Sequence, residues 1–113
     1  MDAWSLYGMG LEQYEKGNYS AAIEYFEQSN NIEEHFKSYE RLFRCWKELG
    51  NKEKEKSCIE KAYEMNPRND KTAFEYAKFQ SEEGNITLAK KVLEELIDRN
   101  PTYKKAREML ENM

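Results

Sequence analysis

A Gly-Asn dipeptide recurs three times along this chain at nearly constant spacing. Gly17 and Gly50 are 33 residues apart, and Gly50 and Gly84 are 34 apart. Pro67 and Pro101 each follow one of these glycines by 17 residues. A fixed period of this length is typical of repeat arrays, in which each unit is too small to bury its own apolar face and packs on its neighbour. Such arrays present surfaces for holding other molecules, so the period favours binding over catalysis.

The stretches between these landmarks carry apolar side chains at helical spacing. Tyr39, Leu42, Phe43 and Trp46 follow the i, i+3, i+4, i+7 pattern of an amphipathic helix, and the other stretches behave alike. Glycine ends a helix, asparagine caps the next one, and proline stops a preceding helix and suits the first turn of a following one. The chain is therefore predicted to be all-α, with helices at 3–16, 20–31, 34–49, 53–65, 69–83, 86–99 and 102–112.

Composition narrows the class of protein further. The 113 residues suit one domain, and 39% hydrophobic residues, with 13% aromatic, are enough to build a core. The net charge of -4 argues against a general nucleic-acid-binding protein, which usually carries a basic excess. We therefore expect a protein or peptide partner and no nucleic acid.

Neither a membrane span nor a secretion signal is expected. The chain contains no run of about 18 apolar residues, and the start from Met1 to Gly10 lacks basic residues and a long apolar stretch. Cys45 and Cys58 form no disulfide framework, which fits a reducing interior. These features predict a cytoplasmic protein.

Residues suited to catalysis or metal binding are sparse. His35 is the only histidine and has no cysteine at ligand spacing, so we expect it to lie exposed near the start of the third helix. Cys45 is expected to be a small buried residue. Cys58 lies among lysines, including Lys54 and Lys61, which could lower its pKa and suit it to a redox role. No nucleotide-binding or hydrolase motif occurs, so neither a cofactor nor enzymatic activity is expected.

The repeated pattern resembles the tetratricopeptide repeat, a 34-residue helix-turn-helix unit, over essentially the whole chain. Small, aromatic and proline residues stand at the family's signature positions: Gly10, Tyr14, Gly17, Tyr19, Ala22 and Phe26, then Leu42, Trp46, Gly50, Ile59, Ala62 and Pro67, then Ala77, Gly84, Ala89, Leu93 and Pro101. The resemblance implies a right-handed α-solenoid in a single domain, 1–113. It places three repeats at about 3–35, 36–69 and 70–103, and a capping helix at 102–112. The segment from Tyr76 to Phe79 is also similar to the half-a-TPR repeat of RNA-processing scaffolds, which the other two repeats do not match.

The second repeat departs from the family pattern. Phe43 and Glu55 occupy positions where the family prefers small residues, which let the two helices of a repeat approach closely. The helices of this pair are therefore expected to be splayed, with Glu55 reaching for solvent by its stem. The first repeat is one residue short, and Glu34 stands in place of its closing proline.

In this family the first helix of each repeat lines a concave groove that holds peptides. The positions carried over to this chain are Trp4, Tyr7, Leu11, Tyr14, Lys37, Arg41, Arg44, Lys47, Lys71, Phe74 and Lys78. The basic members would attract an acidic segment and the aromatic members would anchor side chains. Ordinary solvated charge is the alternative, because Glu40, Glu48 and Glu75 are placed to pair with these cations along the helices.

Some members of the family hold a C-terminal carboxylate with a clamp of lysine, asparagine, asparagine, lysine and arginine. The matching positions here are Tyr7, Leu11, Arg41, Lys71 and Glu75. Only Lys71 agrees in type and Glu75 reverses a charge, so such a clamp is not expected.

The sequence thus predicts a non-enzymatic adaptor that binds an acidic peptide or helix in a groove. The alternative is a self-assembling scaffold, because the stretch from Met1 to Leu11 is apolar and has no polar cap before it.

Overall fold

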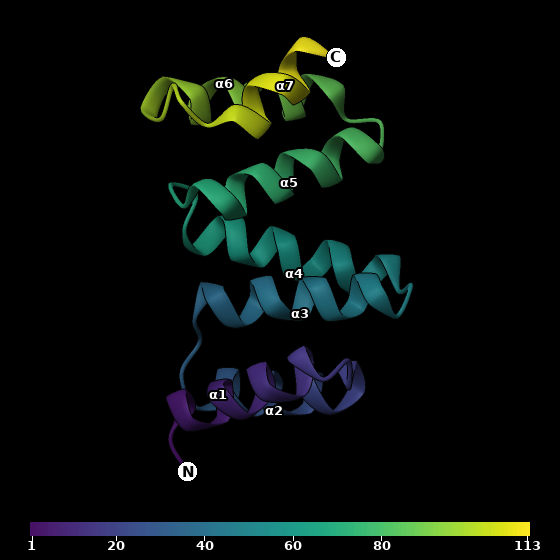
Figure 1. The fold of residues 1–113 in the computed structure, drawn as a ribbon, viewed down its shortest axis with the longest axis vertical. Helices are drawn as coiled ribbons and strands as arrows, with labels where there is room; N and C mark the ends of the chain where they lie inside the picture. The colour runs from purple at the N-terminus through teal and green to yellow at the C-terminus, as the bar shows by residue number, and fades with distance from the viewer. The chain divides into compact units, whose positions relative to one another are not determined.

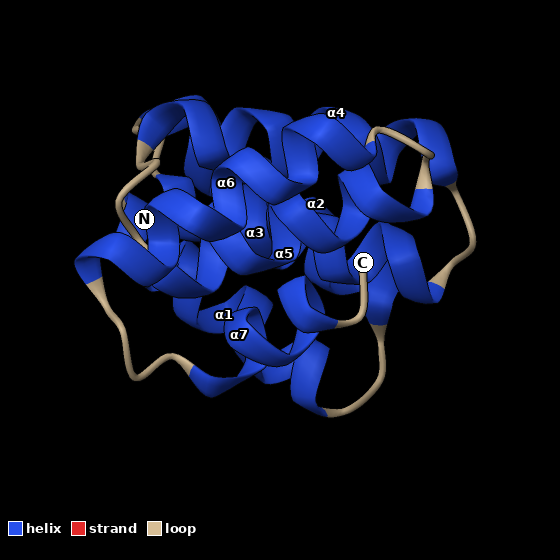
Figure 2. Cartoon of the chain, turned by 90° about the horizontal axis from the view of Figure 1, so that it is seen from above, coloured by secondary structure: helices blue, strands red, loops and turns tan.

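The computed structural model describes all residues, 1–113, as seven α-helices joined by short turns, with no strand (Figures 1 and 2). The helices are α1 (Ala3–Glu15), α2 (Tyr19–Ile32), α3 (Phe36–Glu48), α4 (Lys52–Met65), α5 (Asp70–Glu82), α6 (Ile86–Arg99) and α7 (Lys104–Glu111). Each predicted helix is confirmed to within two residues at either end, as is the all-α fold class. No helix is long and apolar enough to cross a lipid bilayer.

The chain divides into two compact units, Met1–Met65 and Asn66–Met113. In the first unit α1 packs along α2, α3 packs along α4, and α2 also contacts α3 (Figure 1). In the second unit α5 packs along α6, and α7 packs on α6. Each expected repeat is therefore a pair of adjacent helices.

The three Gly-Asn dipeptides end the first helix of each pair in the same way. Gly17, Gly50 and Gly84 have φ of 79°, 75° and 87°, a left-handed conformation that only glycine adopts without strain. At Gly17 the amide donates to the carbonyl of Tyr14 at 3.0 Å, and the next amide reaches back to Gln13 at 2.9 Å. This hydrogen-bond pattern satisfies the last carbonyls of the helix and recurs at the other two turns. The predicted glycine helix ends are confirmed.

The asparagines of these turns differ from the prediction. Only Asn51 caps the following helix with its side chain, by accepting from the Lys54 amide at 3.1 Å. Asn18 instead donates from Nδ2 to Gln13 Oε1 at 2.9 Å, so its side chain braces the preceding helix. Asn85 does the same with Gln80 at 2.7 Å. A glutamine five residues before the asparagine provides this alternative acceptor, and the middle repeat has none there.

The two prolines lie in connecting turns, outside the helices that follow them. After Pro67, α5 is capped by Asn69, whose Oδ1 accepts from the Thr72 amide at 3.0 Å. After Pro101, the amide of Tyr103 donates to the Asn100 carbonyl at 3.1 Å and closes a turn. This turn explains why α7 begins two residues later than predicted.

The core of each unit is built from apolar side chains at helical spacing, as predicted, although Tyr39 and Trp46 of the expected stripe are only half-buried. In the first unit these side chains are Leu6, Ala22, Ile23, Phe26, Leu42, Phe43, Cys45, Cys58, Ile59 and Ala62. In the second unit they are Ala73, Phe74, Ala77, Phe79, Ala89, Val92, Leu93, Leu96 and Ala106. Burial of these stripes is the main stabilising term for helices of this length.

A close contact joins the first helix pair. The ring of Phe26, fully buried on α2, lies directly over Gly10 on α1. A Cβ at Gly10 would lie 2.6 Å from Cε1 of this ring, well inside van der Waals contact. The absence of a side chain at Gly10 is therefore what admits Phe26.

The expectation of a splayed middle pair is wrong. Phe43 is 2% exposed, and α3 packs along α4 as extensively as α1 packs along α2. One period after Phe26 the chain carries the smaller Ile59, which is fully buried. The large side chain of Phe43 is therefore accommodated in the core of this pair without being exposed.

Glu55 is also placed differently from the expectation that it reaches solvent. It is 2% exposed and shares the buried face of α4 with Cys58 and Ile59, one turn further on. The Nζ atom of Lys52 lies 3.8 Å from the Glu55 carboxylate, so the buried negative charge has a positive partner nearby. A buried carboxylate is stable only with such partners, and the i, i+3 lysine supplies one.

Polar contacts hold together the open ends of two helix pairs. In the first unit the Ser29 hydroxyl donates to the Ala3 carbonyl at 2.8 Å, which ties the end of α2 to the start of α1. In the second unit Asp70 accepts from Asn100 Nδ2 and Arg99 Nε, each at 2.9 Å. These two partners hold the pKa of Asp70 below its usual value.

The last helix covers α6 as a capping helix would. Its Ala106 is fully buried, and Tyr103 at its start contacts the ring of Phe74 with centroids 5.9 Å apart. Charged side chains occupy its exposed positions: Lys104, Lys105, Arg107, Glu108 and Glu111. An apolar inner side and a charged outer side are what a capping helix of a repeat array needs.

The contact between Gly10 and Phe26 generates the first prediction. Gly10→Ala should lower the free energy of unfolding by about 1–3 kcal/mol, because the new methyl group overlaps a fully buried ring. Gly8→Ala is the matched control in the same helix, because no atom lies within 4 Å of the added Cβ. That control should raise stability by about 0.5–1 kcal/mol through helix propensity. Urea unfolding followed by circular dichroism measures both, and equal effects of the two variants would contradict this account.

Candidate functional site

The first helix carries a row of large side chains along one face. Trp4, Tyr7, Leu11 and Tyr14 recur at three- and four-residue intervals, which places them on one side of α1. Asp2 sets the start of the helix, because its side chain accepts from the Ser5 amide at 2.7 Å. Trp4 is 61% exposed, and the other three are half-buried. This row therefore offers apolar area to solvent from a rigid element.

The start of α3 brings His35 against this row. His35 is the N-cap of α3: its Nδ1 accepts from the Lys37 amide at 3.2 Å. Its ring stacks on Phe36 with centroids 5.0 Å apart and lies 5.4 Å from the ring of Trp4. The expectation that His35 lies exposed is wrong, because capping α3 turns its ring toward α1 and leaves it half-buried.

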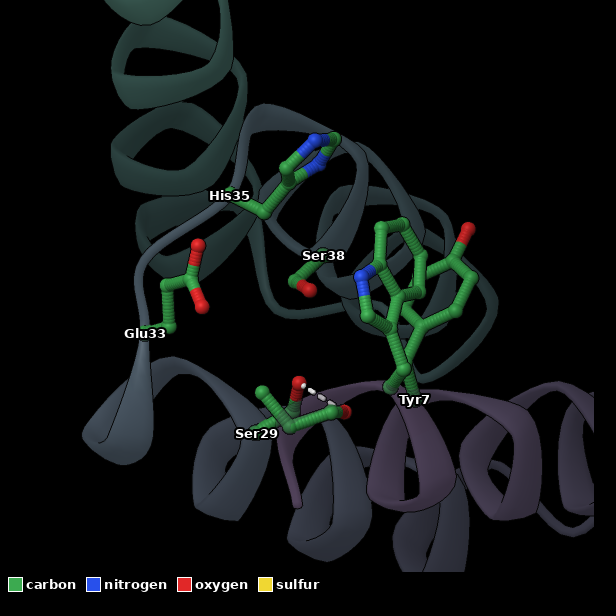
Figure 3. A pocket seen from close by; sticks show the side chains of 7 residues that line it. Tyr7, Ser29, Glu33, His35 and Ser38 are labelled. Atoms are coloured by element: carbon green, nitrogen blue, oxygen red, sulfur yellow. Dashed lines mark hydrogen bonds between the residues drawn. The ribbon is translucent and has the colours of Figure 1, made fainter.

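A small pocket opens between α1, the end of α2 and the start of α3. Its lining residues are Ala3, Trp4, Tyr7, Ser29, Glu33, His35 and Ser38. Figure 3 shows His35 above the pocket and Ser29 below it, Glu33 and Tyr7 on opposite sides, and Ser38 near the middle. Trp4 meets Tyr7 edge-on at 5.6 Å, and Tyr7 packs on Phe26 at 5.5 Å. These contacts hold the aromatic wall of the pocket in place before any ligand arrives.

Sequence reasoning missed five of these lining residues: Ala3, Ser29, Glu33, His35 and Ser38. Four of them lie between the last turn of α2 and the first turn of α3, and no family position marks them. His35 could have been predicted from its position, because it directly precedes Phe36, the first residue of α3, where an N-cap residue is expected.

Arg41, in the second turn of α3, faces the other end of the row. Its guanidinium carbon lies 5.4 Å from the centroid of the Tyr14 ring, in cation–π contact. No ion pair engages Arg41 within the protein, whereas Arg44, one turn further along, donates to Glu40 from Nε and Nη2 at 3.2 and 3.1 Å. The alternative interpretation, in which a cation pairs with a carboxylate of its own helix, therefore holds for Arg44 and not for Arg41.

The other basic residues expected in the first unit are peripheral. Lys37 and Lys47 are exposed on α3, and Lys47 Nζ lies 6.0 Å from the Phe43 ring. They add positive charge near Arg41 without a fixed geometry. We therefore define the α1–α3 face by the residues that contact one another or line the pocket: Trp4, Tyr7, Leu11, Tyr14, His35, Ser38 and Arg41.

The remaining expected groove residues belong to α5 in the second unit. Lys71 is exposed and Lys78 is half-buried. Phe74 is only 9% exposed and packs on Tyr103, so little of its ring is available to a ligand. That α5 contributes to one groove together with α1 and α3 stays a prediction.

The two thiols lie in the core of the first unit, and Cys45 is confirmed as a buried residue. Burial raises the pKa of the Cys58 thiol to about 11, and Lys54 offsets this only in part. Burial likewise raises the pKa of Cys45 to about 12. The proposal that nearby lysines make Cys58 reactive is wrong, because desolvation outweighs their charge. No three His, Cys, Asp or Glu side chains are grouped as a metal site.

Comparison with known families identifies the class of protein. Tetratricopeptide repeat family models match residues 5–35, 46–69 and 72–103, one for each helix pair. The chain belongs to the tetratricopeptide repeat family, as the resemblance implied. A comparison with curated protein sequences finds no match.

Solved structures of this family share the fold. Yeast Tom70 matches with a TM-score of 0.82 and 23% identity over 97% of this chain, which spans only 23% of Tom70. The Yersinia enterocolitica type III secretion chaperone SycD, in complex with a peptide of the translocator YopD, matches at 0.78 and 22% over 96% of this chain and 88% of that one. The first TPR of Spaghetti (RPAP3), bound to the HSP90 peptide SRMEEVD, matches at 0.83 and 17% over 99% and 94%. These similarities establish the all-helical solenoid fold of the family.

The buried thiols lead to a test of chemical reactivity. Because a raised pKa leaves almost no thiolate near neutral pH, native Cys45 and Cys58 should react with iodoacetamide far more slowly than in urea. Mass spectrometry of the alkylated protein at pH 8 measures this for each cysteine. Because the pKa values of the folded thiols exceed the ordinary thiol value of 9.0, the stability that the two thiols contribute is present below pH 9. This stability is lost as the pH rises toward 11 to 12. Rapid labelling of native Cys58 at pH 8 would contradict the assignment.

Proposed function

We propose that this chain is a non-enzymatic protein-interaction module that holds a peptide segment of another protein on its α1–α3 face. The observation that carries the proposal is the exposure of Trp4, at 61%, while its ring is fixed by Tyr7 and His35. A large apolar side chain left in water is a cost to a monomer unless a partner covers it. Tryptophan and tyrosine are also the side chains that most often anchor an interface.

The rigidity of the face supports a binding role further. Tyr7 rests on the buried ring of Phe26, and His35 is held by the cap of α3. A face that is ordered before binding loses little conformational entropy when a ligand arrives, which favours affinity. Two relatives of similar fold, SycD and the first TPR of Spaghetti, hold peptides in their solved structures, and this supports the same kind of ligand here.

The charge of the face favours an acidic partner. Arg41 has no ion pair, and Lys37 and Lys47 lie exposed on the same helix, although the protein as a whole carries a net charge of -4. A local positive field steers acidic segments toward the face. The buried, unpaired thiols fit a reducing compartment, so the proposed setting of the adaptor is the cytoplasm.

A comparison of two exposed apolar residues tests the proposal. Peptides selected from a random phage-displayed library against the wild-type chain should bind the Trp4→Ala variant about tenfold or more weakly, as for an anchor residue. Leu49→Ala is the matched control, because Leu49 is 46% exposed in the same unit but lies outside the α1–α3 face. The control should leave affinity unchanged by fluorescence anisotropy. Equal loss in both variants, or no loss in Trp4→Ala, would refute this location of the site.

Self-assembly is a second candidate, favoured by the exposed apolar end of the first unit. Met1, Trp4 and Ile32 are 77%, 61% and 57% exposed. The bond from Ser29 to Ala3 keeps this end of α2 beside the start of α1. If this end pairs with a second copy, sedimentation velocity should show a concentration-dependent mass that Ile32→Ser reduces. A monomer across the accessible concentration range would remove this candidate and leave the peptide proposal intact.

A further inference from the structure

We infer that the pocket between α1, the end of α2 and the start of α3 binds a primary ammonium group, supplied by a lysine side chain of the partner. This inference rests on the proposed function, because it names one group of the partner that the α1–α3 face holds. Five of the seven residues that line the pocket lie outside the groove positions carried over from the family.

The size of the pocket limits what can enter it. Its volume of about 20 Å³ has room for about one water molecule, so no large side chain fits inside. A lysine ammonium is a compact charge, close to a water molecule in size, whereas a guanidinium is a broad planar group. The four-carbon stem of the lysine stays outside, along the exposed ring of Trp4. Size therefore favours the head group of a lysine over that of an arginine.

The polar atoms of the pocket are suited to accept hydrogen bonds. Ser29 and Ser38 are 3% and 1% exposed, and their hydroxyl groups point into the same space as the Glu33 carboxylate (Figure 3). The Ser29 hydroxyl donates its proton to the Ala3 carbonyl at 2.8 Å, so its oxygen keeps lone pairs that can accept. No hydrogen bond or ion pair within the protein engages the side chains of Glu33 and Ser38. An ammonium group has three donors and no acceptor, which matches two hydroxyl oxygens and one carboxylate.

The aromatic walls of the pocket also favour a cation. Trp4 and Tyr7 meet edge to face, at 88° with centroids 5.6 Å apart, and the His35 ring lies 5.4 Å from Trp4. The face of an aromatic ring attracts a positive charge, and tryptophan does so most strongly. No lysine or arginine of this chain lines the pocket, so no cation of the protein itself fills it.

The surroundings of the pocket do not oppose a positive charge. The end of α2 presents its last carbonyl groups, the negative end of the helix dipole. At the starts of α1 and α3, the amides of Ser5 and Lys37 donate to the side chains of Asp2 and His35, at 2.7 and 3.2 Å. The guanidinium of Arg41 lies at the other end of the row of aromatic side chains on α1. The carboxylate of the pocket is therefore the charge that an entering group meets first.

These features distinguish a primary ammonium from other forms of lysine. Trimethylation keeps the positive charge but enlarges the group and removes its N–H donors, so the buried acceptors stay unpaired. Acetylation removes the charge that the carboxylate and the rings attract. The pocket therefore selects unmodified lysine.

Titration of the isotope-labelled protein with n-butylammonium, which stands in for a lysine side chain, tests the pocket directly. At constant ionic strength, NMR spectra should show saturating shifts of the amides of Ser29, His35 and Ser38 and of the Trp4 indole. Tetramethylammonium carries the same charge without a donor and should bind about tenfold more weakly, as expected when hydrogen bonds to a charged group are lost. The broader n-butylguanidinium should bind no better than tetramethylammonium.

Two neighbouring carboxylates provide matched variants for this titration. Glu33→Gln removes the charge in the pocket and should weaken the binding of n-butylammonium about fivefold, as for loss of an exposed ion pair. Glu34→Gln removes the same charge one residue away, where the carboxylate accepts from the Tyr39 hydroxyl at 2.7 Å outside the pocket. This control should leave the affinity unchanged. Circular dichroism and urea unfolding show that both variants remain folded before binding is compared.

Acetylation of selected peptides tests whether a lysine is the source of the ammonium group. Peptides from the phage selection that depend on Trp4 should contain a lysine. Acetylation of that lysine should weaken their binding about tenfold, because the donors to the buried acceptors are lost with the charge. Acetylation of the peptide N-terminus alone should change nothing, and fluorescence anisotropy measures both.

The outcomes distinguish this inference from the function on which it rests. Absence of shifts around the pocket, which leaves it to water alone, or equal binding of tetramethylammonium overturns the inference. An equal effect of Glu34→Gln assigns the binding to the general field, and a loss on N-terminal but not on lysine acetylation assigns it to a chain terminus. Both of these results also overturn the inference, and the proposed function stands wherever Trp4→Ala still weakens the selected peptides. If Trp4→Ala changes nothing in the phage selection, the proposed function itself fails.

Discussion

The close approach of the two helices within a pair is the contact on which the first unit depends. Phe26 lies fully buried over Gly10, at a distance that admits no side chain beneath it. This contact sets how near α1 lies to α2, and the left-handed turn at Gly17 returns the chain in the required direction. The ring of Tyr7 rests on Phe26 in turn, so the outward face of α1 is supported by the same contact.

The exposed face of α1 that we propose as a binding site follows from this packing, because only part of the helix surface is needed for the core. Once α1 buries Leu6 and Gly10 against α2, Trp4 is left exposed, while Tyr7 and Tyr14 lie half-buried at the edge of this contact, beside Phe26 and Tyr19 of α2. The start of α3 then brings His35 and Arg41 onto these rings. The same helices thus supply both the core and the surface proposed for recognition, as the helices of other repeat proteins do.

The polar residues show how burial changes chemistry that local sequence suggests. Glu55 and Cys58 both have lysines as neighbours in the sequence, yet both lie on the buried face of α4. The carboxylate keeps Lys52 as a partner, while burial raises the pKa of the thiol to about 11. Charged neighbours on a helix stay in solvent, so they act weakly on a group that points the other way. Whether such a residue is charged or reactive depends on which way its side chain points, and the number of charged neighbours in the sequence does not reveal that direction.

The sequence by itself determined the number, type and ends of the helices and the family of the chain. Apolar periodicity and the Gly-Asn and Asn-Pro turns are local signals, and their hydrogen bonds form within a few residues. It also determined which side chains of α1 form an exposed row, since helical spacing alone places Trp4 and Tyr7 together. Tertiary structure decided the pocket, because Ser29, His35 and Ser38 come from different elements and meet only after α2 and α3 pack. It likewise placed Arg41 over the Tyr14 ring of another helix, whereas the Arg44–Glu40 ion pair is an i, i+4 contact within α3 that helical spacing alone allows.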